Sequence, residues 1–361
     1  MFSLHIDTAR TWRGGQSQVL LTVLGLRAAG HRAALVAHPA GELWRRASEG
    51  PDLIPIAVRS EMDLSAAWKL SRVVKQLGPA IVHAHDPHAV AIAALALSMS
   101  TETVKPRLVA ARRVDFHLKT NALSRWKYRQ VERFICSSDA IRRMLVADGV
   151  PEALTITVRE GIDIERVAAA PAADLHAEFW LPHHAPIVGN VAALVPHKGQ
   201  THLIEAAALV VRKVPDARFV IAGEGDLRPS LERLIKERRL EKHVFLAGFR
   251  PDVLSVHKAF DIFAMSSVTE GLGTSVLDAM ACAKPVVATA AGGIPEAVVD
   301  GVTGVLVEPR DHDAMARALI ALLADEDART RMGAAGLRRV RDEFSIERLV
   351  RETLRVYEHV L

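Results

Sequence analysis

Short apolar runs alternate with segments of helical periodicity along the first half of the chain. The apolar runs predict strands at residues 2–7, 33–37, 53–56, 80–83, 107–111 and 133–137. Between them, apolar positions recur every three or four residues and predict helices, for example over 16–29, 64–77 and 89–98. Short apolar strands that alternate with helices indicate a parallel sheet covered on both faces.

The same alternation restarts in the second half, after a stretch rich in alanine and proline that has no strand pattern. A helix is predicted over 199–214, and strands are predicted at 187–192, 218–222, 244–246, 261–265, 285–289 and 304–307. We therefore predict two α/β domains, each with a doubly wound parallel sheet. Ligands of such sheets bind beyond the carboxyl ends of the strands, so two facing sheets predict an interdomain cleft.

The domain limits follow from where the pattern stops and restarts. The predicted segments are an N-terminal domain over 1–167, a linker over 168–186, a second domain over 187–343, and a final helix over 344–361 that packs back on the first domain. A chain of 361 residues that is 50% hydrophobic has enough apolar surface for two such cores.

The cellular location is predicted from the two isolated cysteines and from the lack of a signal-peptide or membrane-spanning pattern. Cys136 and Cys282 are far apart in sequence and lie in or beside apolar runs, which favours two free thiols over a disulfide. The first residues read as a strand rather than a signal peptide, and the longest apolar run, near 89–99, is too short to span a bilayer. We predict a cytoplasmic protein, soluble or peripheral at the inner face of the plasma membrane.

Positive charge is concentrated in one part of the chain. The net charge is +4, and eleven basic residues between Lys105 and Arg143 face only three acidic ones. Such a cluster suits an anionic membrane surface, an acidic acceptor or nucleic acid, and it is equally typical of a solvated helix face. Aromatic residues for base stacking are sparse here, so nucleic acid is not predicted as a partner.

One stretch after the predicted strand 261–265 combines two carboxylates, two glycines and two hydroxyls. Its chemical groups belong to Glu270, Gly271, Gly273, Thr274, Ser275 and Asp278. Glycines let the backbone turn sharply and approach a ligand closely. A helix that begins here offers unpaired amides and a positive dipole end to a phosphate, while the acids suit hydroxyl groups. This pattern is typical of a sugar-nucleotide site.

Seven motifs occur in one order along nearly the whole chain. They are Gly14-Gly15, His83-Ala84-His85-Asp86, Gly161-Ile162-Asp163, Pro196-His197-Lys198-Gly199, Ala222-Gly223-Glu224-Gly225, the 270–278 segment and Gly292-Gly293-Ile294-Pro295-Glu296. Each is weak alone, and their common order and spacing are specific. With them the chain resembles the retaining glycosyltransferases of family 4, which have the GT-B fold of two Rossmann-like domains facing across a cleft.

The resemblance implies a nucleoside-diphosphate sugar as co-substrate. No metal and no other cofactor is predicted, since the sequence lacks metal-ligand spacings such as CxxC and HExxH. Lys198 would neutralise the departing diphosphate, and Glu270 would hydrogen-bond the transferred sugar. The predicted catalytic residues are Lys198 and Glu270, which the resemblance implies, and His85, for its acid–base chemistry. The implied donor-binding residues are Gly14, Gly15, Lys198, Glu224, Phe249, Arg250, Glu270, Gly271, Leu272, Gly273, Thr274 and Asp278.

Four residues of the first half are predicted to bind the acceptor: Gln16, His85, Arg112 and Arg113. A histidine after the fourth strand could orient a hydroxyl or act as a base, and the alternative is a loop histidine satisfied by backbone groups. Three positions depart from the family pattern. Asp278 replaces a glutamate, Ala193 replaces an arginine, and the Arg112-Arg113 pair stands where a histidine is common.

The function predicted from this resemblance is sugar transfer to an acceptor hydroxyl with retention of the anomeric configuration. The resemblance implies front-face attack, with a sugar or lipid-linked acceptor of cell-envelope polysaccharide, lipopolysaccharide or glycolipid synthesis. Two alternatives stay open: an epimerase or phosphorylase on the same fold, and a non-catalytic nucleotide-sugar-binding protein. Asp311-His312-Asp313 spells a metal motif of another fold, but it opens a helix, which favours helix capping.

Overall fold

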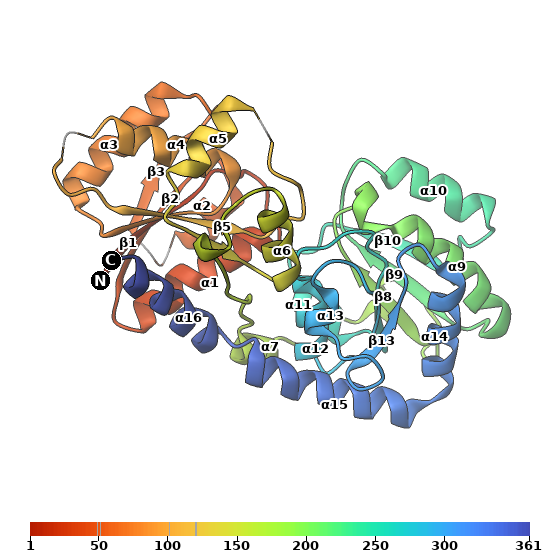
Figure 1. The fold of residues 1–361 in the computed structure, drawn as a ribbon. Coiled ribbons are helices and arrows are strands. Elements are labelled where there is room, and N and C mark those ends of the chain that lie inside the picture. Colours follow the sequence, from red (N-terminus) through yellow and green to blue (C-terminus); the bar gives the residue numbers. More distant parts are fainter. Residues whose placement is uncertain (49, 51, 101, 120) are drawn as a thin grey trace. The chain divides into compact units, whose positions relative to one another are not determined.

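The chain forms two compact units, each with its own parallel sheet (Figure 1). The computed structural model of the protein describes residues 1–48, 50, 52–100, 102–119 and 121–361. Unit 1 consists of Met1–Gly161 with Ile346–Leu361, and unit 2 consists of Ile162–Ser345. The two predicted doubly wound sheets are confirmed. Residues 168–186, expected as a linker, are assigned to unit 2, where Leu175 and Leu181 are buried in the core.

The described residues of unit 1 form a parallel sheet of seven strands in the order β3-β2-β1-β4-β5-β6-β7. Its strands are β1 (Phe2–Asp7), β2 (Arg32–Ala37), β3 (Asp52–Pro55), β4 (Ile81–Ala84), β5 (Arg107–Arg112), β6 (Arg133–Cys136) and β7 (Thr155–Thr157). The central strands are mostly buried, as a sheet covered on both faces requires, although β1 also buries the polar residues Ser3, His5 and Asp7. Strand β7 was not predicted, because three residues are too short for a periodicity.

The helices of unit 1 cover the two faces of this sheet. They are α1 (Gly14–Ala28), α2 (Glu42–Ala47), α3 (Leu64–Leu77), α4 (Pro87–Ser98), α5 (Ala122–Arg129), α6 (Asp139–Ala147), η1 (Glu152–Leu154) and α16 (Ile346–Val360). Cap residues explain where several begin and end. For α3, Asp63 accepts from the amide of Ala66 at 3.0 Å, and Gly78 closes the helix in the left-handed conformation.

The C-terminal helix α16 is part of the core of unit 1. It lies along α1 (Figure 1), where Gly25 lacks the side chain that would meet Val350. Tyr357 of α16 is fully buried, and its hydroxyl lies 2.7 Å from Nδ1 of His83 on β4. The last residues of the chain thus form a helix that packs on a sheet whose strands all come from the first 157 residues.

The described residues of unit 2 form a parallel sheet of six strands in the order β10-β9-β8-β11-β12-β13. Its strands are β8 (Ile187–Val191), β9 (Arg218–Ala222), β10 (Val244–Gly248), β11 (Ile262–Met265), β12 (Val286–Thr289) and β13 (Gly304–Val307). Its helices are α7 (Ile164–Ala169), α8 (Leu175–Glu178), η2 (Pro196–Lys198), α9 (Gln200–Lys213), α10 (Arg228–Glu237), α11 (Val253–Lys258), α12 (Thr274–Ala281), α13 (Ile294–Ala297), α14 (His312–Ala324) and α15 (Glu326–Glu343).

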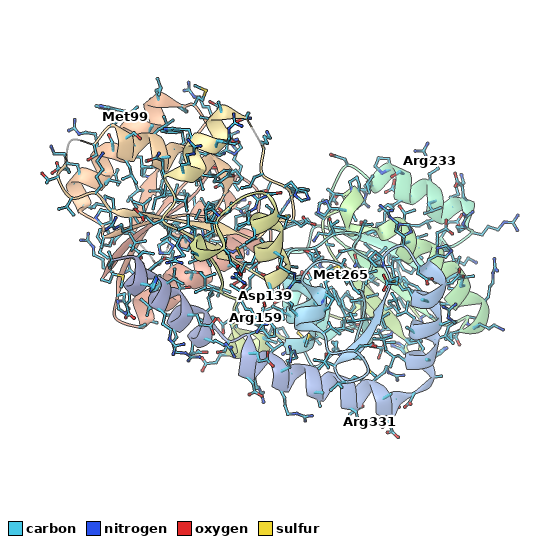
Figure 2. All side chains as sticks on the ribbon, in the orientation of Figure 1. Met99, Asp139, Arg159, Arg233, Met265 and Arg331 are labelled. Atoms are coloured by element: carbon cyan, nitrogen blue, oxygen red, sulfur yellow. The ribbon has the colours of Figure 1, made fainter. Side chains whose placement is uncertain are left out.

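Burial in unit 2 follows the apolar pattern. Met265, the last residue of β11, lies inside the unit, whereas Arg233 of α10 and Arg331 of α15 lie at its exposed periphery (Figure 2). Asp311 caps α14 by accepting from the amide of Ala314 at 2.8 Å, which confirms the capping interpretation of its motif.

Both cysteines are free thiols, as predicted. Burial raises the pKa of Cys136 and of Cys282 to about 12, so neither is a thiolate near neutral pH. A search of the described helices finds none with the length and apolar character that a bilayer crossing needs.

Candidate functional site

In unit 2 the predicted site residues Lys198 and Glu270 follow two neighbouring strands. Strands β8 and β11 are paired at the centre of the sheet, where the strand order reverses. In open parallel sheets, ligands bind beyond the carboxyl ends of the strands at such a reversal. The segment after β8 leads into η2 and Lys198, and the segment after β11 leads into Glu270 and α12.

Lys198 and Glu270 form an ion pair at this point. The Lys198 ammonium Nζ lies 2.5 Å from Oε2 of Glu270, and their side chains are 19% and 11% exposed. The Ser267 hydroxyl donates to the same oxygen at 3.1 Å. Two residues 72 positions apart are therefore brought together, as the predicted donor site requires.

The loop after β11 is fastened to η2 by backbone contacts. The amide of Val268 donates to the carbonyl of His197 at 2.8 Å, and the Ser266 hydroxyl donates to the carbonyl of Lys198 at 3.2 Å. Gly199 has a φ of +64°, and a Cβ there would lie 2.1 Å from the Ser266 carbonyl oxygen. This close approach holds the Lys198 backbone against the loop that carries Glu270.

Helix α12 presents an open N-terminus. Gly273 precedes it with a φ of +90°, a conformation that glycine adopts without a steric cost. The first-turn amides of Thr274 and Ser275 have no hydrogen-bond partner within the part of the chain that the structure describes. Unpaired amides and the positive end of the helix dipole form a suitable seat for a phosphate group.

Gly292 supports Glu270 from the next loop. Its φ is +53°, and a Cβ at this position would lie only 1.8 Å from the carbonyl oxygen of Glu270. The neighbouring amide of Gly293 donates to that oxygen at 3.2 Å. The glycine pair therefore lets a loop pass directly against the Glu270 backbone.

Asp278 lies about one turn inside α12, and its carboxylate makes no hydrogen bond to any described residue. Burial raises the pKa of Asp278 to about 7, and Arg166 opposes this rise. The ordinary value is 3.8, so the folded protein holds this proton more tightly than the unfolded chain does. In its ionised form this carboxylate only accepts hydrogen bonds, which suits two neighbouring hydroxyls.

We expect Asp278→Asn to stabilise the free protein at alkaline pH. With a folded pKa of about 7, the free energy of unfolding falls as the pH rises from about 4 to 7, since ionisation costs the native state. Removing the charge should therefore raise the free energy of unfolding at pH 8 by about 1–3 kcal/mol. Urea unfolding at pH 8 and pH 4 measures this: a gain of equal size at both pH values would contradict a charge effect.

Three other residues predicted to bind the sugar nucleotide, Glu224, Phe249 and Arg250, either pair with residues of unit 2 or are exposed. Glu224 pairs with Arg228 at 3.1 Å, and Phe249 is 51% exposed. Arg250 forms ion pairs with Glu178 and with Asp252, and these acids raise the pKa of its guanidinium above the usual value. Arg250 would have to share these bonds to reach a donor.

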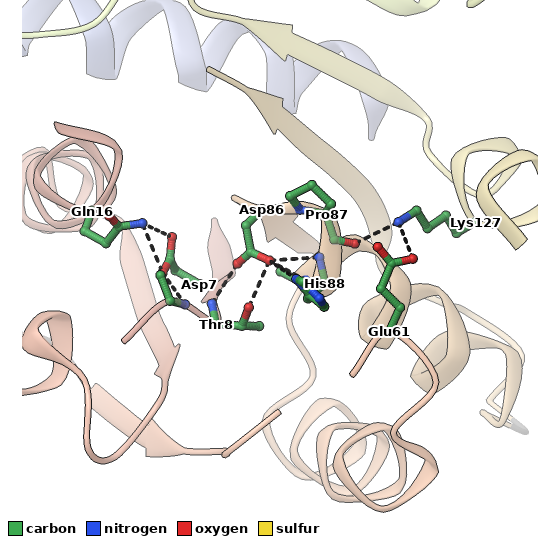
Figure 3. A network of polar contacts seen from close by, with 10 residues as sticks. Asp7, Thr8, Gln16, Glu61, Asp86, Pro87, His88 and Lys127 are labelled. Atoms are coloured by element: carbon green, nitrogen blue, oxygen red, sulfur yellow. Dashed lines mark hydrogen bonds and ion pairs between the residues drawn. The ribbon is translucent and has the colours of Figure 1, made fainter. Parts of the chain in front are cut away.

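In unit 1 the corresponding reversal of strand order lies between β1 and β4. Asp86 caps α4 and also accepts from the amide and hydroxyl of Thr8, at 2.7 and 2.9 Å (Figure 3). Asp7, at the end of β1, accepts from Gln16 at 3.2 Å, and burial together with Asp86 raises the pKa of Asp7 to about 6. Gln16, a predicted acceptor residue, also accepts from the amide of Arg13 at 3.2 Å.

Gly14 and Gly15 begin α1 beside this network. At its start the Gln16 side chain accepts from the amide of Arg13 in a capping box, whereas a Cβ at Gly15 would meet nothing within 4 Å. The helix N-terminus is thus open on the side of Gly15, which fits the predicted use of these amides.

His85 lies in a buried chain of hydrogen bonds. Its Nδ1 is 2.9 Å from Arg113, its Nε2 is 2.9 Å from Nδ1 of His5, and Nε2 of His5 is 3.0 Å from the Ser3 hydroxyl. A guanidinium only donates, so Nδ1 of His85 accepts from Arg113. The Nε2–H of His85 then donates to Nδ1 of His5, and the Nε2–H of His5 donates to the Ser3 hydroxyl. Burial, followed by positive neighbours, lowers the pKa of both imidazoles, that of His5 to about 3. His85 has no free ring nitrogen here, so a role with substrate would require it to give up one of these bonds.

His5, His83 and His85 lie close enough together to hold a metal ion, since their ligand atoms lie within 4.8 Å of one another. Their environment suits a cation poorly. The Arg113 guanidinium donates into the cluster, and the facing lone pairs of His5 and His85 are used in hydrogen bonds. The cluster is better described as a neutral polar core beneath the sheet edge.

Arg112 ends β5 and Arg113 follows it, and both are largely buried. Arg112 donates to the carbonyl of Phe116, and Arg113 lies 3.7 Å from the buried carboxylate of Glu160. Burial lowers the pKa of both guanidinium groups. Their hydrogen bonds within unit 1 show a structural use that the sequence pattern did not indicate.

The basic cluster of residues 105–143 is only partly at the surface. Lys127 is 1% exposed, pairs with Glu61 at 2.8 Å and donates to the carbonyl of Pro87 at 3.1 Å (Figure 3). Arg107 and Arg142 pair with acids. The exposed members are Lys105, Arg107, Lys119, Arg125, Arg129 and Arg143.

Sequence reasoning missed Ser267, and it quoted Gly292 as part of a motif without assigning it a function. The structure places both against Glu270. Ser267 has no signal of its own in a single sequence. The Gly292-Gly293 pair signals a close backbone approach, but not to which residue.

Solved structures place the two units in a known fold. HepE of Anabaena, solved with UDP-glucose, superposes with a TM-score of 0.86 at 21% identity, over 99% of this chain and 100% of that one. A sucrose-phosphate synthase of Thermosynechococcus elongatus gives a TM-score of 0.79 at 20% identity, over 99% of this chain and 98% of that one. With the two parallel sheets, these likenesses define the GT-B fold.

The family is identified by sequence. The profile of the glycosyl transferases group 1 matches residues 173–339, and that of glycosyltransferase family 4 matches residues 12–166. The chain belongs to the group 1/family 4 glycosyltransferases.

Among curated relatives, a GDP-mannose-dependent alpha-(1-6)-phosphatidylinositol monomannoside mannosyltransferase of Mycolicibacterium smegmatis is 38% identical over 197 residues. The matched part is 52% of this chain and 51% of that relative. A 2-deoxystreptamine glucosyltransferase of Streptomyces kanamyceticus is 29% identical over 251 residues, 68% of this chain and 65% of that relative. The chain thus spans about half the length of the first relative that it matches.

Proposed function

We propose that the protein is a retaining, metal-independent glycosyltransferase that uses a nucleoside-diphosphate sugar. The observation that carries the proposal is the Lys198–Glu270 ion pair, which follows the paired strands β8 and β11 and adjoins the segment that opens α12. A cation and unpaired amides suit a diphosphate, and a carboxylate suits sugar hydroxyls. Membership of the group 1/family 4 glycosyltransferases supports the same reaction class.

In the proposed reaction the bond between the sugar C1 and the diphosphate oxygen breaks, and a bond from C1 to the acceptor oxygen forms on the same face. The acceptor proton moves to the leaving phosphate oxygen. Negative charge grows on the diphosphate, so Lys198 and the amides of Thr274 and Ser275 stabilise the transition state more than the ground state. Glu270 orients the sugar, and Asp278 accepts from the ribose hydroxyls.

We propose a hexose donor and a sugar or lipid-linked acceptor of cell-envelope synthesis. One relative, a GDP-mannose-dependent phosphatidylinositol monomannoside mannosyltransferase, supports both parts, and the other, a 2-deoxystreptamine glucosyltransferase, supports the hexose donor alone. The replacement of glutamate by Asp278 shortens the reach to the ribose by one methylene, which a small shift of α12 or of the nucleotide can offset.

A peripheral location at the cytoplasmic membrane face belongs to the same proposal. It is supported by the exposed basic residues of the 105–143 cluster and by Phe116, which is 57% exposed. Basic side chains near an anionic surface each contribute about 1 kcal/mol of attraction. Flotation with vesicles of phosphatidylglycerol and phosphatidylcholine, compared with phosphatidylcholine alone, measures it, and equal flotation would remove this part of the proposal.

A donor screen tests the reaction itself. The full chain is incubated with GDP-mannose, UDP-glucose, UDP-galactose or UDP-N-acetylglucosamine, with and without a membrane lipid extract, and release of nucleoside diphosphate is measured. We expect one donor to be used, with release increased by an acceptor. Isomerised sugar without an acceptor would favour an epimerase, and phosphate-dependent release of a sugar phosphate would favour a phosphorylase. Calorimetric binding without turnover would favour a binding protein.

A further inference from the structure

The two carboxylate oxygens of Glu270 have different surroundings. Oε2 accepts from the Lys198 ammonium at 2.5 Å and from the Ser267 hydroxyl at 3.1 Å. Oε1 has no hydrogen-bond partner among the described residues, and it is not one of the buried unsatisfied atoms, so solvent reaches it. One oxygen is therefore held by the protein, and the other is presented outward.

We propose that Ser267 is a positioning residue that fixes the Glu270 carboxylate so that Oε1 faces the sugar of the donor. The inference rests on the proposed function and adds a residue to it. The terminal torsion of a glutamate is broad and has no strong intrinsic preference. Hydrogen bonds to one oxygen are therefore what determines the direction of the other.

Ser267 matters most when a donor is bound. The Lys198 ammonium has three N–H donors, and a diphosphate draws it away from Glu270. The Glu270 side chain is only 11% exposed, so water reaches it poorly. Without a second protein donor, Oε2 would then lack a hydrogen bond, and the carboxylate would rotate to form a new one. The Ser267 hydroxyl keeps its bond to Oε2 and so keeps Oε1 in place.

The residue that carries this hydroxyl is buried and anchored through its backbone. Ser267 is fully buried, and its carbonyl accepts from the hydroxyl of Thr289, at the end of β12, at 2.6 Å. Thr289 is 2% exposed. A buried donor anchored to a central strand is a precise support for a carboxylate.

The neighbouring serine provides a matched control. Ser266 is equally buried, but its hydroxyl donates to the backbone carbonyl of Lys198 at 3.2 Å and not to Glu270. Ser266→Ala and Ser267→Ala each remove one buried hydroxyl from adjacent positions. A purely structural role predicts similar changes for both.

The experiment measures the dissociation constants of a nucleotide sugar and of the bare nucleoside diphosphate, using GDP-mannose with GDP and UDP-glucose with UDP. For Ser267→Ala, we expect the nucleotide sugar that the wild type uses to bind roughly tenfold more weakly, and the diphosphate to bind within about twofold of the wild type. For Ser266→Ala, the ratio of the two constants should stay near that of the wild type. Ser267→Thr, which keeps a hydroxyl, should recover most of the ratio if it folds.

The outcomes separate this inference from the function on which it rests. Equal weakening of sugar nucleotide and diphosphate in Ser267→Ala, or the same ratio in both alanine variants, would overturn the positioning role while leaving the transferase intact. A wild type that binds none of the four ligands would instead overturn the proposed function. Thermal unfolding of both variants shows whether either change comes from a loss of folded protein.

Discussion

Lys198→Ala is expected to reduce kcat about 100- to 1000-fold with the donor that the wild type uses. Removing one preorganised group that meets developing charge typically costs this much. The charge here is that of the leaving diphosphate, and Lys198, at the end of η2, is the cation beside Glu270. Because the interaction strengthens as the bond breaks, kcat should fall more than the KM for the donor rises.

The matched control for this loss is Lys213→Ala. Lys213 is an exposed residue at the C-terminal end of α9, and Lys198 lies just before the start of the same helix. Steady-state release of nucleoside diphosphate is measured for both variants and the wild type. A Lys198→Ala protein that keeps more than a third of the wild-type kcat would show that the diphosphate is stabilised elsewhere.

Gly292→Ala is expected to lower the free energy of unfolding by more than about 3 kcal/mol and to abolish activity in any protein that folds. The new Cβ would lie 1.8 Å from the carbonyl oxygen of Glu270, far inside a van der Waals contact, so the backbone has to move. A left-handed φ adds about 1–2 kcal/mol for any residue with a Cβ. The displaced residue is Glu270 itself, which couples stability to the site.

Gly301→Ala separates the steric cost of the new Cβ from the conformational cost of a left-handed φ. Gly301 has a similar left-handed φ of +72°, but a Cβ there would meet nothing within 4 Å. Only the conformational cost of about 1–2 kcal/mol should remain, with activity close to that of the wild type. Urea unfolding of the two variants measures the difference, and equal losses would mean that the loop at Gly292 relaxes freely.

Much of the fold was predictable because its signals are local. Buried parallel strands are short apolar runs, and helices between them show their own period, so the central strands of both sheets were found within a residue or two. The short strand β7 lacked such a signal. The resemblance to family 4 glycosyltransferases was equally accessible, since its motifs are short and their order survives in one sequence.

The partners of the predicted residues were not accessible. Arg113 and His85 were predicted to bind the acceptor, and the structure shows them largely buried and bonded to each other. Lys127 counted toward a basic surface, yet it is buried against Glu61. Charge and residue type are properties of the sequence, whereas burial and pairing depend on segments that lie 28 to 66 positions away.

The sequence by itself determined two α/β sheets, the family, and the residue types that a sugar nucleotide requires, because each of these is written in local patterns. Only the tertiary structure decided that Lys198 and Ser267 share one oxygen of Glu270, that Gly292 lies against the Glu270 backbone, and that His85 has no free nitrogen. Such contacts arise when separate strands end at one edge of a sheet, and no local pattern specifies which atoms then meet.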